Sequence, residues 1–408
     1  MNLRRMTITA TVAALAIGVP ARGAGAQDAL LPTTGWGIGT AVNAWHFSSA
    51  VPQAAGAVAD VAEVAVPFRV RSVFGNWSFD LSGAAAMGAA HLTSGAASDS
   101  GGGGDRLVTI YGPTDLRLRL TGPLMIEGFT VTAGVNIPTG KVGLNGDETT
   151  ALQAVGAPAL RMPIGAFGTG PGATLGLIRT LQGDDWAVAL GGSVEQRAEY
   201  SPIALALSNG KADTKVTPGT AIHLTAGLDR ALGDGRWSVL AVGDVFSKDK
   251  VRLAGGDPAD TSSDYTLGPQ LSVLSQMEFA WTGWRESSLN LAARYRSEYA
   301  DATGARVSGS SGSYLEATLG GVRGGPEGAG LILVADGRWQ SGLKFTDALV
   351  GAAVTEAGLT LGLERASSST LTRYTIHGQF GSFDTGTTKT SGFGATIGMS
   401  ISARREAR

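Results

Sequence analysis

The stretch TGWGIGTAVNA, residues 34–44, decides the fold class of this chain. A glycine break leads into Trp36, and from there Trp36, Ile38 and Val42 alternate with small or polar residues. Successive side chains of a strand point to opposite faces, so the pattern predicts a β-strand with one apolar and one polar face. A tryptophan beside a turn is typical of the aromatic girdle that anchors a membrane β-barrel at the lipid boundary.

Tryptophan follows a similar short break several times along the chain. A water-soluble sheet has no reason to place its largest side chain repeatedly beside a turn, whereas a barrel rim does. The predicted periplasmic girdle consists of Trp36, Trp77, Trp186, Trp237 and Trp284.

The period-2 alternation recurs from residue 36 to residue 402. The clearest further segments are 66–71, 77–82, 115–120, 129–137, 186–194, 222–228, 237–245, 265–281, 289–295, 315–319, 331–339, 359–363 and 393–401. They predict an all-β fold, a transmembrane antiparallel up-and-down β-barrel spanning 36–402. We expect 16 strands, with 14 as the alternative because 341–391 alternates weakly.

The connections between these segments alternate between short and long, which distinguishes a membrane barrel from a soluble β-sandwich. Tight breaks such as Gly75-Asn76 and Gly183-Asp184-Asp185 predict short periplasmic turns. The predicted long external loops are 48–63, 92–106, 139–170, 200–217, 248–263 and 300–313.

Both termini carry segments outside the predicted barrel. Residues 1–26 have the form of a signal peptide: Arg4 and Arg5, an apolar run, then Ala24-Gly25-Ala26 as a cleavage pattern. Residues 27–35 form a short N-terminal segment, too short for a plug. Residues 403–408 form a polar C-terminal tail after the last strand. This organisation predicts export to a bacterial outer membrane.

Composition narrows the partners of the chain. Charged residues make up 16%, against about 25% in soluble domains. No mature segment is apolar for 18 consecutive residues, so spanning helices are not expected. A net charge of −2 argues against nucleic-acid binding. The expected partners are outer-membrane lipid, the barrel-assembly machinery and a small-molecule solute, with the oligomeric state undetermined.

If the apolar phase faces lipid, the opposite phase lines the interior, because an arginine in hydrocarbon costs about 2–4 kcal/mol. Two explanations fit these polar residues: a water-filled conduit that selects solutes, or ion pairs that satisfy a buried interior. The pore-lining candidates are Arg69, Arg71, Asp80, Asp115, Arg117, Arg119, Glu195, Arg197, His223, Asp229, Arg294, Arg296, Glu298, Asp336 and Arg338.

The longest predicted loop, 139–170, is the candidate for a constriction inside the barrel. It carries Lys141, Asp147, Glu148 and Arg161 among glycine, alanine and proline. Folded inward, these charges would narrow the pore. Folded outward, they would be solvated loop charges, and the sequence leaves both placements open. A barrel of 14 to 16 strands is too wide for its side chains alone to fill.

Enzyme chemistry is not expected. The chain has four histidines and no cysteine, and no Ser-His-acid grouping or metal motif follows from local spacing. A barrel hydrolase built from distant strands would depend on His223 or His377. We therefore predict no catalytic residue, no metal and no cofactor.

Two neighbouring segments, YGPTDLRL (111–118) and VNIPTGK (135–141), resemble a family of outer-membrane transporter-like β-barrels. That family is associated with phenol degradation by the meta-cleavage pathway. The resemblance implies uptake of small, aromatic or apolar compounds. The residues themselves predict a channel for passive uptake of small solutes. The alternative from another class is a closed structural or adhesion barrel that acts through its external loops.

Overall fold

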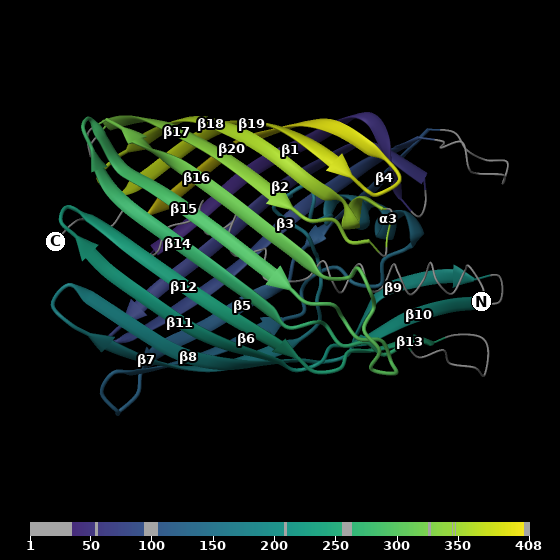
Figure 1. The fold of residues 1–408 in the computed structure, drawn as a ribbon, viewed down its shortest axis with the longest axis horizontal. Coiled ribbons are helices and arrows are strands. Elements are labelled where there is room, and N and C mark those ends of the chain that lie inside the picture. Colours follow the sequence, from purple (N-terminus) through teal and green to yellow (C-terminus); the bar gives the residue numbers. More distant parts are fainter. Residues whose placement is uncertain are drawn as a thin grey trace.

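The computed structural model describes residues 35–53, 56–93, 105–207, 210–254, 263–324, 328–344, 346 and 348–403. Within these ranges the chain forms an antiparallel barrel, with a second, three-stranded sheet at one end (Figure 1). The predicted signal peptide 1–26, nearly all of 27–35 and all but the first residue of the 403–408 tail lie outside the described residues. In the described part, no helix is long and apolar enough to cross a membrane.

The barrel wall is a single sheet of seventeen strands. They are β1 (Gly35–Gln53), β2 (Gly56–Phe74), β3 (Trp77–Thr93), β4 (Arg106–Pro113), β5 (Leu116–Pro123), β6 (Phe129–Ile137), β7 (Gly172–Gln182), β8 (Trp186–Arg197), β11 (Ala221–Leu232), β12 (Gly235–Phe246), β14 (Gln270–Trp281), β15 (Trp284–Arg296), β16 (Gly312–Arg323), β17 (Gly328–Gln340), β18 (Ala353–Ala366), β19 (Thr370–Asp384) and β20 (Lys389–Ala403).

The predicted number of strands is confirmed. β4 and β5 follow one another along the same edge of β3, so seventeen strands occupy sixteen positions around the wall. β20 pairs with β1 over eleven residues and closes the barrel. Closure leaves no free sheet edge to face lipid, which is the condition for a sheet to span a bilayer.

The two ends of the barrel differ in their connections. Tight turns such as Gly75–Asn76 and Gly233–Asp234 lie at one end, which we call the hairpin end. The opposite end, which we call the loop end, carries the second sheet of β9 (Tyr200–Leu207), β10 (Gly210–Thr217) and β13 (Lys250–Ala254) (Figure 1). This asymmetry is the one expected of an outer-membrane barrel.

Two predicted loops are strands instead. The segment 48–63 is mostly sheet, since β1 runs on to Gln53 and β2 starts at Gly56. Val51, Val58 and Val61 are buried there inside the barrel, and this burial favours continued pairing. The segment 200–217 is mostly the β9–β10 hairpin. Alanine and glycine in these two segments are neither clearly apolar nor clearly polar, so the alternation of a strand was not recognisable in the sequence.

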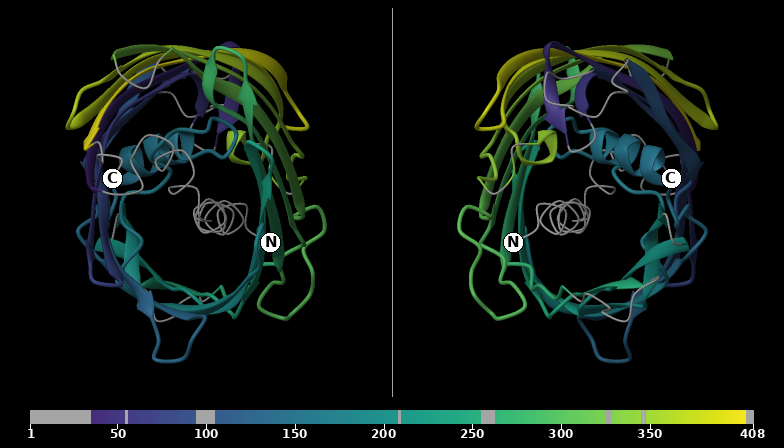
Figure 2. Two further views of the ribbon diagram at one scale, coloured as in Figure 1. Left: turned by 90° about the vertical axis from the view of Figure 1, so that its left-hand side faces the viewer. Right: turned by 90° about the vertical axis from the view of Figure 1, so that its right-hand side faces the viewer.

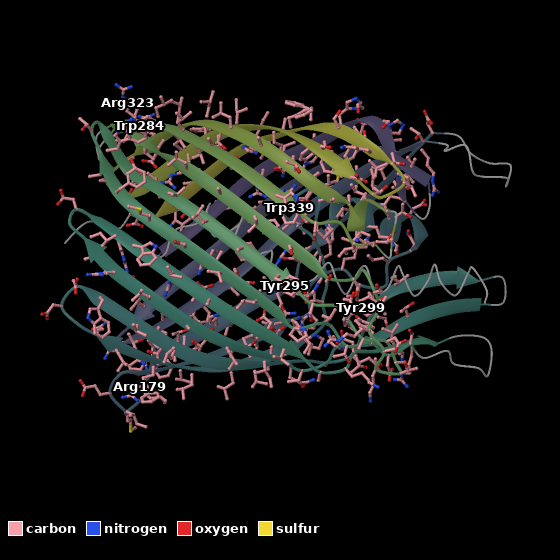
Figure 3. All side chains as sticks on the ribbon, viewed as in Figure 1. Arg179, Trp284, Tyr295, Tyr299, Arg323 and Trp339 are labelled. Carbon is pink, nitrogen blue, oxygen red and sulfur yellow. The ribbon has the colours of Figure 1, made fainter. Side chains whose placement is uncertain are left out.

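Strand register places apolar side chains outward around the wall. Leu175, Leu224 and Ile397 are each about 60% exposed, the exposure expected of a lipid-facing belt. The five girdle tryptophans lie on this outward face near the hairpin end. Trp284 reaches it because the β15–β16 register shifts between Arg285 and Ser288. Figure 3 shows Trp284 at the hairpin end, and Tyr295 and Trp339 displaced along the barrel towards the loop end.

Candidate channel lumen and its inward segment

The connection between β6 and β7, residues 138–171, folds into the barrel, and we call it the inward segment. Its helix α3 (Gly146–Val155) starts with a capping box, in which Asn145 accepts from the Glu148 amide and Glu148 accepts from the Asn145 amide. Figure 2 shows α3 lying inside the barrel, beside the first strands. Of the two placements left open by the sequence, the structure shows the inward one.

An apolar core joins the inward segment to the wall. Leu160 and Val155 from the segment pack with Trp45, Ile110 and Phe383 from the strands, and all five are at most 2% exposed. The Trp45 indole Nε1 donates to the Leu160 carbonyl at 3.1 Å, so the polar atom of the ring is satisfied in this core. We call the loop-end portions of β1–β4 and β16–β19, together with the inward segment, the packed region.

Ion pairs join Arg161 of the inward segment to strands β16, β17 and β18. Arg161 pairs with Glu316 and lies 3.3 Å from Asp336 and 3.8 Å from Glu356. Arg338 pairs with Glu356, and both side chains are fully buried. Arg338 also donates to the carbonyls of Pro158 at 3.1 Å and Ala159 at 2.6 Å. A buried ion pair is stabilised when its remaining donors also have hydrogen-bond partners. The two carbonyls supply these partners to both terminal nitrogens of Arg338, whereas its buried Nε has no partner among the described residues.

The other constriction candidates lie nearer the loop end. Lys141 Nζ is 2.5 Å from Glu148 Oε1, and Arg106 is 3.1 Å from Asp147 in an exposed pair. Burial opposes the charge on Glu148, but Lys141 and the Asn145 amide outweigh it and hold the pKa of Glu148 below its usual value. Of the four, Arg161 is the one whose described ion pairs reach β16, β17 and β18.

The described residues leave the rest of the barrel interior open along the inward faces of β5–β8, β11, β12 and β14, which we call the open region. By register with Asp244 and Gln276, Leu240 and Leu274 point inward, yet they are 37% and 47% exposed. Arg117 and Arg119 also face inward and are exposed. Side chains that are both enclosed by a wall and exposed to solvent line a water-filled space.

Most predicted lining residues form two clusters on the inward face. One is Arg69, Arg71, Asp80, Arg117 and Arg119 on β2, β3 and β5, with Arg69 paired to Asp80 at 2.6 Å. The other surrounds His223. Its members are His223, Glu195, Arg197 and Asp244, with His223 Nδ1 2.7 Å from Asp244, His223 Nε2 3.6 Å from Glu195 and Arg197 2.7 Å from Glu195.

The remaining lining candidates are more scattered. Asp229 pairs with Arg236 near the hairpin end. The Arg294 guanidinium lies over the Tyr314 ring, 5.1 Å from its centroid. Arg296 lies two residues further along the same face of β15. These charged side chains lie on β11, β12 and β15.

Four predicted lining residues do not border the open space. Asp115 is 6% exposed because it fills the break between β4 and β5, where it accepts from the Thr169 amide at 2.7 Å and from Asn136 at 2.9 Å. Asp336 and Arg338 are covered by the inward segment. Glu298 lies beyond the end of β15 and accepts from the Gly309 amide at 3.0 Å.

Residues 48–306 match the family model described as "Putative MetA-pathway of phenol degradation". This match covers more than half of the chain. The chain belongs to that family. The resemblance drawn from segments 111–118 and 135–141 is therefore confirmed, and both segments lie within the matched range.

Several solved structures have a similar course of the chain. The CymD monoaromatic hydrocarbon channel is 9% identical, covers 96% of this chain and 94% of its own, and has a TM-score of 0.39. A TodX monoaromatic hydrocarbon channel mutant is 9% identical, with 92% and 91% covered and a TM-score of 0.44. OccK2 of Pseudomonas aeruginosa, in complex with glucuronate, is 11% identical, with 92% and 98% covered and a TM-score of 0.37. At these values the likeness carries no functional conclusion. No curated protein matches the chain in sequence.

The sequence did not predict which strand residues of this family member contact the inward segment. Trp45 and Glu63 hold the segment, the latter by accepting from the Ile164 amide at 2.9 Å. A signal existed for Trp45, because it falls on the polar phase of the first strand, where a large apolar ring needs a partner inside the barrel. Glu63 gave no comparable signal.

The histidines have structural partners. Both ring nitrogens of His223 face carboxylates, so neither is directed at a nucleophile. His377 contacts Thr360 at 2.9 Å and Gln379 at 3.1 Å. On the outward face, His46 and His91 flank Asp60 at 2.7 and 3.0 Å. Among the described residues, no group of three or more His, Asp or Glu side chains is arranged to hold a metal ion.

Proposed function

We propose that the chain is an outer-membrane channel that lets small solutes, aromatic compounds among them, cross passively. One observation carries the proposal: the inward segment occupies only part of the interior, and inward side chains such as Leu274 stay exposed opposite it. Membership of a phenol-degradation family supports aromatic solutes. The hairpin end would face the periplasm.

The proposal includes the route to the membrane. Residues 1–26 direct export and are removed, and the barrel-assembly machinery inserts the mature chain. The girdle tryptophans then lie at the periplasmic boundary and the Tyr295 and Trp339 side chains towards the external one.

The test is single-channel conductance of the refolded mature chain in a planar bilayer under a salt gradient. Heat-modifiable migration on a gel establishes folding first. Steady current steps support an open channel, and the reversal potential reports its ion preference. Folded protein without current would overturn the proposal and favour a closed or adhesion barrel.

A further inference from the structure

The arginines of β2 and β5 face the interior with few acids to balance them. Arg69 and Arg71 lie on β2, and Arg117 and Arg119 lie on β5, with β3 between the two strands. Register sets Arg71 opposite Asp80 and Asp80 opposite Arg119, and it sets Arg69 and Arg117 on either side of Ser82. Directly opposed side chains on a sheet lie about 5 Å apart at Cβ, so the four arginines form one patch. We call it the arginine cluster.

Two acids lie next to the cluster, and both are already engaged. Asp80 is paired with Arg69. Asp115 has its carboxylate oxygens bonded to the Gly140 amide at 2.8 Å, the Thr169 amide at 2.7 Å and the Asn136 amide group. Among the described side chains, four arginines against two acids leave a local charge of +2. Such a concentration of like charge destabilises a compact fold unless an anion shares the site.

The hydrogen bonds of the cluster are incomplete. The Nε of Arg71 is buried and has no hydrogen-bond partner in the described part of the chain. Arg117 and Arg119 are exposed to the interior. A buried donor without an acceptor costs about 1–3 kcal/mol, so an acceptor delivered from the open space would be stabilised there.

The surroundings leave room for a ligand. Several inward positions on the neighbouring strands are small: Gly37 and Gly39 on β1, and Gly134 and Thr132 on β6, whereas Asn136 lies opposite Arg117. A Cβ added to Gly134 would meet nothing closer than 3.5 Å. Small side chains at these positions leave space beside the arginine cluster among the described residues.

We propose that the arginine cluster binds the carboxylate of small organic acids as they pass through the barrel. Guanidinium groups recognise planar carboxylates through paired hydrogen bonds, and several of them together favour an anion over a neutral molecule of equal size. The proposal rests on the proposed channel function and deepens it, since it names acidic rather than neutral compounds as the solutes selected. An inorganic oxyanion such as phosphate shares the chemistry but lacks the organic body.

The test uses the refolded mature chain, benzoate as the probe, benzamide as its neutral counterpart and inorganic phosphate as the second oxyanion. Calorimetric titration measures binding, and bilayer current measures block. We expect benzoate to bind and reduce the current, and benzamide to do neither. The double variant Arg117→Gln/Arg119→Gln should weaken benzoate binding about tenfold or more.

Arg179→Gln is the matched control, because Arg179 lies on the outward face, over the Phe129 ring at 5.4 Å (Figure 3). It should leave benzoate binding unchanged. Equal benzoate affinity in the double variant, equal binding of benzamide, or phosphate binding as tight as benzoate would each overturn the proposal. Current without benzoate binding would refute the site alone, whereas benzoate binding without current would refute the channel function alone.

Discussion

The packed and open regions of the barrel interior share one alternating strand pattern but differ in what the inward positions hold. In the packed region these positions carry Trp45 and Ile110, which are buried against the inward segment. In the open region they carry Thr174, Ser193 and Gly227, which face no segment among the residues that the structure describes. The difference teaches that alternation of apolar and polar residues specifies the barrel wall. The size of the inward side chains specifies whether protein or water fills the interior beside them.

Breaking the buried ion pair should have the largest effect. Arg338→Met leaves the buried Glu356 carboxylate with only the 3.8 Å contact to Arg161, and we expect it to lower the free energy of unfolding by about 3–5 kcal/mol. Arg236→Met removes the more exposed pair with Asp229 and should cost less than about 1 kcal/mol. Urea unfolding of both variants in lipid vesicles measures the difference. Equal losses would show that the packed region contributes no special stability.

A pair of identical truncations compares the regions directly. Leu160→Ala opens a cavity in the core, since Leu160 is 1% exposed, and should cost about 2–5 kcal/mol. Leu274→Ala removes a side chain that is already 47% exposed and should stay within about 0.5 kcal/mol. The same unfolding measurement applies. A Leu274→Ala loss as large as that of Leu160→Ala would mean that the open region is packed too.

Replacing a glycine by a larger residue also distinguishes the packed region from the open region. A Cβ on Gly88 would lie 2.6 Å from a Val155 methyl, so Gly88→Val should cost about 1–3 kcal/mol through overpacking. Around Gly227 the nearest atoms lie at 3.8 Å, so Gly227→Val should be neutral or slightly stabilising. Thermal unfolding of both variants checks the order. A neutral Gly88→Val would indicate that α3 is not seated against β3.

The smallest effect concerns pH. The pKa of Glu148 is lowered in the folded state, so its stabilisation is present above the unfolded pKa and is lost as the pH falls through the lower folded pKa. Glu148→Gln should therefore cost less than about 1 kcal/mol at pH 7 and nothing at a pH below both values. Paired unfolding curves at the two pH values test this. A cost that persists in acid would contradict the assigned role of the Lys141 contact.

The wall was more predictable than its contents. Alternation and recurring tryptophans such as Trp36 and Trp186 predicted the barrel and sixteen positions, because lipid imposes a simple two-faced pattern on each strand. The placement of 139–170 was not predictable, because Arg161 finds its partners on β16, β17 and β18, more than 150 residues away. Asp115 was assigned to the lumen on strand phase alone, whereas it is buried at the break between β4 and β5 under Gly140 and Thr169 of the inward segment.

The most direct test of the two-region account is thiol accessibility, since the chain contains no cysteine. Leu274→Cys and Ala65→Cys each place one thiol on the inner face of the barrel. The native Leu274 is 47% exposed, whereas the native Ala65 is fully buried. A charged methanethiosulfonate reagent is added while the bilayer current is recorded. The account predicts rapid modification and a stepwise loss of current for Leu274→Cys, and neither for Ala65→Cys in the folded protein. Equal modification rates at the two positions would contradict it.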